Sequence, residues 1–250
     1  MWEVELVTSL SNKRIINYIY KMMKGYMQDK SCVLTTLETD KESKILFACA
    51  VNKKDYYLEM IKLCISDYII NVYKYEYLIK NIENFMDDDI KFKSFIKLLS
   101  LYDKSTDEQA LKNSIHIDNC FYIDSFIKFR MTPLVNHWKE LCNLAIENFD
   151  FFMSNDTFMD LMRFLVATMD ESCEKIKIVE LKGTYSIYNI AKNCENAELV
   201  DECTTPFSLI SAVLKICPKF IDIYVSNNSD TAIKFLQNVY ENRIKIIEEN

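Results

Sequence analysis

Glycine and proline are scarce in this chain of 250 residues, which has two glycines and three prolines. Both glycines stand alone, Gly25 near the end of a predicted helix and Gly183 between two apolar runs. A loop that cradles phosphate needs several glycines at fixed spacing, so P-loop and Rossmann nucleotide-binding proteins are excluded. Because turn-forming residues are so few, we expect most of the chain to be helical.

The sequence also has few side chains that are spaced to ligate a metal or to act as a nucleophile. The chain has two histidines, His116 and His137, and its nine cysteines are spread singly with no CxxC pair. This spacing predicts no metal and no cofactor, because structural zinc is held by closely spaced cysteines and histidines. A cysteine nucleophile would need a histidine beside it in space, which the sequence alone does not show. Without a secretory signal we expect reduced, buried cysteines and a cytoplasmic location.

The charge of the chain is unfavourable for general nucleic-acid binding. The formal net charge is −7 at pH 7, whereas phosphate contacts come from lysine and arginine. Lys13, Lys21 and Lys24 nevertheless fall at nearly the same angle around one predicted helix, at 100° per residue. This basic face is the best candidate for contact with an acidic partner, although we favour a solvated helix face, which is what most charge runs form. No apolar run reaches about 18 residues, so we predict no transmembrane segment.

The order of predicted elements gives an α+β fold with a predominantly helical centre. Residues 1–54 read as a βαββ segment, with a helix capped by Ser11 and a hairpin of strands 32–39 and 44–51. Residues 171–250 read as a ββαβαβ segment. Its predicted strands are 175–181, 185–190, 220–225 and 243–247, and its predicted helices are 207–216, capped by Thr205 with Pro206, and 231–240, capped by Ser229. One mixed sheet shared by both ends is an arrangement that this order allows.

The central region, residues 55–170, is predicted to be helical. A long helix is expected from an Asn52 cap to about residue 85, and Asp87, Asp88 and Asp89 are expected to start the next helix as a solvated cap. Residues 104–109 are predicted to be a flexible polar loop. Apolar residues at steps of three and four then predict two helices, 134–152 and 158–169, that pack as an antiparallel hairpin.

Two arginines in this region are the candidate anchors. Arg130 follows Phe126 and Phe129, and Arg163 lies between Met162 and Phe164. Arginine in apolar company is either half-buried beside a carboxylate or held out to bind an anion. We favour the structural pair, with the acids nearby in sequence as partners: Asp124, Glu147, Asp160 and Asp170.

Three stretches of this sequence resemble the YtxC-like family of sporulation proteins. They are IDSFIKFRM, DTFMDLMRFLV, and SAVLKICPKFIDIYV with FLQNVYENRIKI. The family's FxxFR motif corresponds to Phe126, Phe129 and Arg130, and its LLRxFV-like motif corresponds to residues 161–166. Thr132 and Pro133 depart from the family pattern and predict a kink or a new helix start at Thr132. The resemblance implies a role in endospore-forming bacteria and names no biochemical activity.

From these observations we predict a sporulation-associated cytoplasmic protein that is not an enzyme. It would act as an interaction or regulatory factor, and its partner would be another protein. The alternative is a nucleic-acid or nucleotide-binding regulator that uses Lys13, Lys21, Lys24, Arg130 and Arg163. An unrecognised hydrolase would need acids and a histidine that converge in one pocket, which the sequence leaves open.

Overall fold

The computed structural model describes residues 1–27, 32–82, 90–148, 155–190, 197–225 and 230–248. Contacts group the chain into two compact units, each built from two separate stretches. The N-terminal unit comprises Met1–Leu78 and Asp103–Asn143, and the C-terminal unit comprises Ile79–Tyr102 and Leu144–Asn250. The predicted segments 1–54, 55–170 and 171–250 describe the succession of elements along the sequence, and this division stays a prediction.

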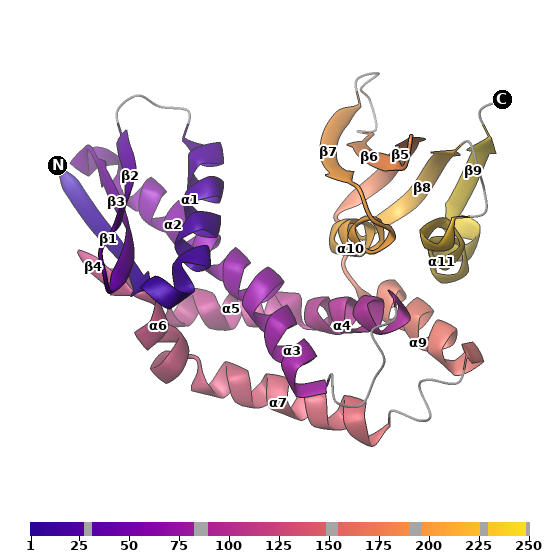
Figure 1. Ribbon diagram of the computed structural model, residues 1–250, viewed down its shortest axis with the longest axis horizontal. Coiled ribbons are helices and arrows are strands. Elements are labelled where there is room, and N and C mark those ends of the chain that lie inside the picture. The colour runs from indigo at the N-terminus through magenta and orange to yellow at the C-terminus, as the bar shows by residue number, and fades with distance from the viewer. Residues whose placement is uncertain (28–31, 83–89, 149–154, 191–196, 226–229, 249–250) are drawn as a thin grey trace. The chain divides into compact units, whose positions relative to one another are not determined.

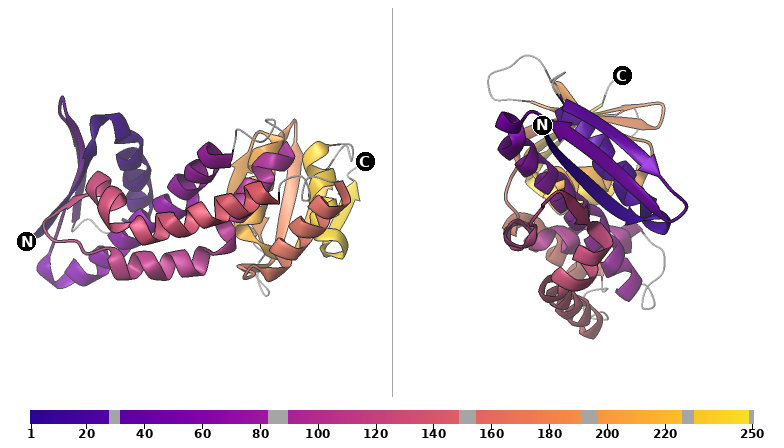
Figure 2. Two further views of the ribbon diagram at one scale, coloured as in Figure 1. Left: turned by 90° about the horizontal axis from the view of Figure 1, so that it is seen from below. Right: turned by 90° about the vertical axis from the view of Figure 1, so that its left-hand side faces the viewer.

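The N-terminal unit is built on a four-stranded sheet of order β2-β3-β1-β4 (Figure 1). Its strands are β1 (Trp2–Ser9), β2 (Cys32–Glu38), β3 (Glu42–Cys49) and β4 (Cys120–Tyr122). The predicted antiparallel hairpin of β2 and β3 is confirmed, and β4, which was not predicted, runs parallel to β1. Helix α1 (Lys13–Tyr26) packs on the sheet through Ile15, Ile19 and Met23, and the right-hand view of Figure 2 looks onto this sheet.

The remaining segments of this unit are helical. They are η1 (Leu10–Asn12), η2 (Val51–Lys53), α2 (Lys54–Tyr68), η3 (Ile69–Tyr73), α3 (Lys74–Ile82), α5 (Lys104–Ser114), α6 (Ile123–Ser125), η5 (Phe126–Arg130) and α7 (Thr132–Glu147). The predicted long helix is therefore interrupted by η3, a π turn, and Asn52 lies in η2 instead of capping α2. Likewise Ser11 lies in η1 and does not cap α1. The predicted helix start at Thr132 is confirmed.

The predicted polar loop at 104–109 is wrong, because these residues form the first half of α5. The sequence of α5 has almost no apolar stripe, so periodicity gave no helical signal. Its inward face instead consists of Leu111 and a buried aspartate, Asp107.

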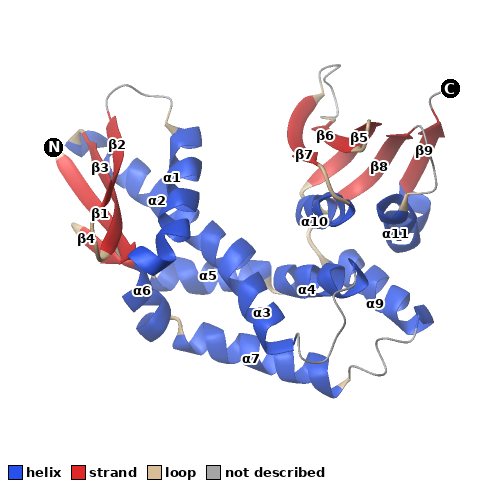
Figure 3. Ribbon diagram, in the orientation of Figure 1, coloured by secondary structure: helices blue, strands red, loops and turns tan. Residues whose placement is uncertain are grey.

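The C-terminal unit holds a second sheet, of order β7-β6-β5-β8-β9. Its strands are β5 (Cys173–Leu181), β6 (Thr184–Asn189), β7 (Glu198–Cys203), β8 (Pro218–Val225) and β9 (Ile244–Glu248). Its helices are α4 (Ile90–Tyr102), α9 (Asn155–Thr168), α10 (Pro206–Ile216), α11 (Thr231–Tyr240) and the short η6 (Glu241–Arg243). The α+β fold class is confirmed, β7 is an additional strand, and the strands form two sheets instead of one shared sheet (Figure 3).

The predicted cap of α10 is confirmed, whereas the cap of α11 is one residue later than predicted. Thr205 caps α10 in a reciprocal capping box with Ser208, and Pro206 occupies the first turn. Gly183, with a φ of 79°, forms the turn between β5 and β6 together with Lys182, at a φ of 54°. Asp230 caps α11, whereas the predicted cap, Ser229, lies outside the described residues, as do Asp87–Asp89.

The two helices of the predicted hairpin belong to different units. Helix α7 lies in the N-terminal unit up to Asn143, whereas α9 lies in the C-terminal unit, where it packs against α4 and α11. The apolar stripe of α9 therefore covers helices of its own unit, and the hairpin is not a unit of this fold.

Asp124 joins the start of α6 to the end of β1. Its carboxylate accepts hydrogen bonds from Thr8 Oγ1 at 3.0 Å, from the backbone N–H of Ser9 at 2.6 Å and from Asn12 Nδ2 at 2.8 Å. Burial opposes ionisation, but these hydrogen bonds outweigh it and hold the pKa of Asp124 below its ordinary value of 3.8. The charged carboxylate therefore stabilises the folded state.

Replacing Asp124 with asparagine is expected to cost about 1–2 kcal/mol of unfolding free energy at pH 7. Because the folded-state pKa is lowered, the contribution of the charge is fully present above the unfolded pKa and is lost as pH falls through the folded pKa. The difference from the parent should therefore shrink in urea unfolding experiments below about pH 4. Asp118→Asn, at an exposed position, is the control, and an Asp124→Asn deficit that persists unchanged at low pH would contradict this assignment.

Candidate interaction site

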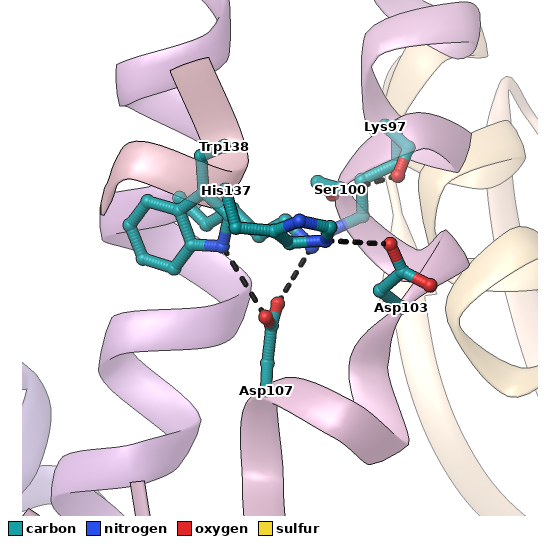
Figure 4. Close-up of polar contacts among 7 residues, drawn as sticks. Lys97, Ser100, Asp103, Asp107, His137 and Trp138 are labelled. Atoms are coloured by element: carbon teal, nitrogen blue, oxygen red, sulfur yellow. Dashed lines mark hydrogen bonds and ion pairs between the residues drawn. The ribbon is translucent and has the colours of Figure 1, made fainter. Parts of the chain in front are cut away.

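A buried ion pair fixes helix α5 within the N-terminal unit. Lys74, the first residue of α3, places its Nζ 2.6 Å from Asp107 Oδ2, and both side chains are 0% exposed. Trp138 of α7 donates from Nε1 to the other oxygen, Asp107 Oδ1, at 3.3 Å (Figure 4). The two carboxylate oxygens are thus satisfied from two helices, which holds the first turn of α5 between them.

Aromatic packing and a second polar contact surround this ion pair. The rings of Tyr73 and Tyr77 pack against Trp138, at centroid distances of 6.2 and 5.9 Å. His137 Nε2 lies 3.0 Å from Asp103 Oδ2, at the residue that precedes α5 (Figure 4). This contact links α7 to the N-cap residue of α5.

With α5 fixed in this way, its outer face forms one wall of a groove. The groove has a volume of about 550 Å³ and lies between α1, α2 with η3, and α5. Its lining residues are Met22, Tyr26, Glu59, Lys62, Leu63, Ser66, Asp67, Ile70, Asn71, Ser105, Glu108, Gln109 and Lys112. Leu63 is 63% exposed and Tyr26 is 50% exposed, so large exposed apolar side chains stand at the wall of a groove that Met22, Ile70 and polar residues also line.

Three acids line the groove, Glu59, Asp67 and Glu108, and Asp67 lies at the end of α2. Its carboxylate accepts hydrogen bonds from the Tyr18 hydroxyl at 2.5 Å and from Asn71 Nδ2 at 2.8 Å. Burial and the hydrogen bond to Asp67 raise the pKa of Tyr18, so this hydroxyl stays a donor. Among the described residues Asp67 has no ion pair, whereas Glu59 is paired with Lys62 at 2.7 Å.

None of the groove residues was singled out from the sequence. They come from segments that are distant along the chain, and an aspartate near a helix end gives no signal of its own there. The π turn η3, which carries Ile70 and Asn71, is the local irregularity that marks this place, since π turns recur at functional sites.

The predicted basic face is exposed but does not line the groove. Lys13, Lys21 and Lys24 are all exposed on α1, and Lys13 forms a 3.8 Å ion pair with Glu38. Their predicted role in binding an acidic partner therefore stays a prediction, as does the alternative of nucleic-acid or nucleotide binding through these lysines and the two arginines.

The predicted half-buried anchor at Arg130 is wrong. Arg130 is exposed and Phe129 is 67% exposed, and only Phe126 of this motif is buried. The segment is the π turn η5, in which Met131 N donates to Phe126 O at 3.3 Å. A π turn has more residues per turn than an α-helix, so the i, i+3 spacing no longer brings the two rings to one face. Asp124, the expected partner, is engaged by residues 8–12.

The predicted structural pair of Arg163 is found. Arg163 Nη1 lies 2.8 Å from Asp160 Oδ1, one turn earlier on α9. Its Nε lies 2.8 Å from both Glu241 Oε1 and the carbonyl oxygen of Asn238, at the end of α11. The guanidinium therefore joins α9 to α11 within the C-terminal unit.

Two of the buried cysteines, Cys64 and Cys142, are poorly suited to nucleophilic attack. All cysteines that the structure describes carry free thiols. Burial raises the pKa of Cys64 to about 12 and that of Cys142 to about 11, so both thiols are protonated at neutral pH. No group of three or more metal-ligating side chains is found in the part of the chain that the structure describes. Within the same ranges, every helix is too short or too polar to cross a bilayer.

The fold and the groove define an α+β protein of two units, the first of which carries a partly apolar groove lined by both acidic and basic side chains. Residues 56–245 match the model of the YtxC-like family, and the chain belongs to this family. No curated protein and no solved structure matches the chain. The resemblance seen in the three sequence motifs is thus confirmed over most of the length.

Proposed function

We propose that this protein is a sporulation-associated interaction factor that binds a segment of a partner protein in the groove between α1, α2 and α5. The observation that carries the proposal is the groove itself, with large exposed apolar side chains beside a carboxylate that lacks a cation. Exposed apolar surface rimmed by polar groups is characteristic of protein-binding sites. The role in sporulation rests on the family to which the chain belongs.

The groove is lined by three acids, Glu59, Asp67 and Glu108, and by two lysines, Lys62 and Lys112, so its acidic excess favours a basic, apolar segment as the bound element. Leu63 and Tyr26 offer apolar contact area, and Asp67 accepts hydrogen bonds but has no ion pair among the described residues. A lysine or arginine from the partner would supply the missing positive charge. Glu108 of α5 also lines the groove, and among the described residues it is paired with Lys104 through an exposed 3.7 Å contact.

The proposal is tested by photo-crosslinking in sporulating cells of an endospore-forming host. A photoreactive phenylalanine at position 63 should give a covalent adduct of one discrete mass. The same residue at position 181, where Leu181 is equally exposed in the C-terminal unit, should not give that adduct. Reversing charge in the groove by Glu108→Lys should weaken the adduct at least several-fold, because a basic segment would be repelled.

Glu140→Lys makes the same change at an exposed position of α7, outside the groove. It is therefore the matched control and should leave the adduct unchanged. The proposal fails if position 63 gives no discrete adduct in sporulating cells, or if both charge reversals weaken the adduct equally.

A further inference from the structure

The sheet of the C-terminal unit has one covered and one open face. Helices α10 and α11 lie on the same side of its strands (Figure 1). On that side the sheet presents Ile176, Ile178, Ile221 and Ile223, which are at most 1% exposed. Because side chains alternate along a strand, the residues between them point away from the two helices. Helices α4 and α9 pack mainly on α10, on α11 and on each other, so among the residues of this unit that the structure describes no helix packs extensively on the second face.

Three aromatic rings lie on this open face. Phe220 and Tyr224 lie two positions before and two positions after Asp222 on β8, on the same side of the strand as Asp222, and Tyr188 lies on β6. The register aligns Tyr188 with Lys177 of β5, and Lys177 with Asp222 of β8. Phe220 is 40% exposed, which is unusual for a phenylalanine in a central strand. The rings therefore form an accessible surface on β6 and β8, the two strands that flank β5.

Lysines are interleaved with these rings. Lys177 of β5 and Lys245 of β9 flank Asp222 in the same row, and neither forms an ion pair with any residue that the structure describes. Lys175 neutralises Asp222, with its Nζ 2.5 Å from Oδ2. The ammonium of Lys177 lies 4.0 Å from the centroid of the Tyr224 ring. Two positive charges are thus left uncompensated beside aromatic rings.

We infer that this open face binds single-stranded nucleic acid. Aromatic rings on a sheet stack with unpaired bases, and neighbouring lysines contact the phosphates. Stacking depends little on base identity, so binding should tolerate many sequences. The site uses none of the basic residues that the sequence offered for nucleic-acid binding, and it lies in the other unit from the groove, so it is independent of the proposed function.

Because the site offers two lysines, Lys177 and Lys245, its binding of a single strand should depend only modestly on salt concentration. With two phosphate contacts, counterion release for a single strand gives a log–log salt slope of about −1.4. Fluorescence anisotropy with labelled 12-mers of oligo-dT and oligo-rU, in 50 mM salt, should therefore detect binding that weakens gradually as salt is raised. An unlabelled single strand should compete, and a duplex of the same length should compete at least several-fold less well.

Two kinds of variant distinguish the contribution of base stacking to binding from the contribution of charge. Tyr224→Ala should weaken binding roughly fivefold or more, because stacking on one base is lost, whereas Tyr224→Phe should retain it. Lys177→Glu should also weaken binding at least several-fold. Lys234→Glu changes the same charge at an exposed position of α11, on the covered side, and should bind like the parent. Circular dichroism melting establishes that each variant is folded.

Three results would overturn the inference. The first is no detectable binding by the parent protein in 50 mM salt. The second is equal weakening by Lys177→Glu and Lys234→Glu, which would indicate a diffuse charge effect. The third is a dimer of the parent that Tyr224→Ala dissociates, since a second copy of the chain would then be the occupant of this face.

Discussion

Lys74→Ala is expected to lower the free energy of unfolding by about 3–5 kcal/mol. The substitution removes the ammonium from a pair whose two side chains are fully buried, and it leaves the Asp107 carboxylate in the interior with a single donor, Trp138. An uncompensated buried charge costs far more than the ion pair contributes, so the loss should be large. Urea unfolding followed by tryptophan fluorescence measures it directly.

Two further variants establish the cause. Lys62→Ala removes an ion pair with Glu59 that is partly exposed, and it should cost only about 0–1 kcal/mol. The double variant Lys74→Met with Asp107→Leu replaces both charges by apolar side chains and should recover most of the stability. A cost of Lys74→Ala that does not exceed that of Lys62→Ala would show that the buried pair is not essential to the fold.

Trp138→Ala is the second large effect and should cost about 3–5 kcal/mol. Trp138 is 0% exposed, so alanine leaves a cavity between α7 and the rings of Tyr73 and Tyr77. Trp138→Phe keeps much of the volume but removes the N–H donor to Asp107, and it should cost about 1–3 kcal/mol. Far-UV circular dichroism in urea is the suitable measurement, since the fluorescent side chain itself is changed.

The control for the aromatic substitutions is Phe129→Ala. Phe129 is 67% exposed, so its removal should change stability by no more than about 0.5 kcal/mol. If Phe129→Ala lowers the free energy of unfolding as much as Trp138→Ala does, the Phe129 ring is buried. The prediction of a buried anchor at the FIKFR motif would then be correct.

Short-range signals in the sequence correctly predicted the features that depend only on residues close together in the chain. Thr205 with Pro206 gave the start of α10, Thr132 gave the start of α7, and Gly183 gave a turn. Arg163 and Asp160, three residues apart, also required only helix geometry. Each of these features is decided by residues within one or two turns of each other.

Features that depend on distant contacts were not predicted. Helix α5 was read as a loop because its buried face holds an aspartate, and only Lys74 and Trp138, each at least 31 positions away in sequence, make that burial favourable. Arg130 was misplaced because η5 is a π turn, which periodicity at 3.6 residues does not anticipate. The groove combines residues from three helices, so no stretch of sequence contains its pattern.

The alternation of the two units along the chain has a consequence for biosynthesis. The chain starts the N-terminal unit, leaves it after Leu78, returns at Asp103 and leaves again after Asn143. During translation the first 78 residues must therefore wait for α5 and α7 to emerge from the ribosome before Lys74 can meet Asp107 and Trp138. The 24 residues Ile79–Tyr102 must wait longer still, until α10 has been made. Neither unit corresponds to one contiguous fragment, so truncations at Leu78 or Asn143 would each leave exposed apolar surface for chaperones to bind.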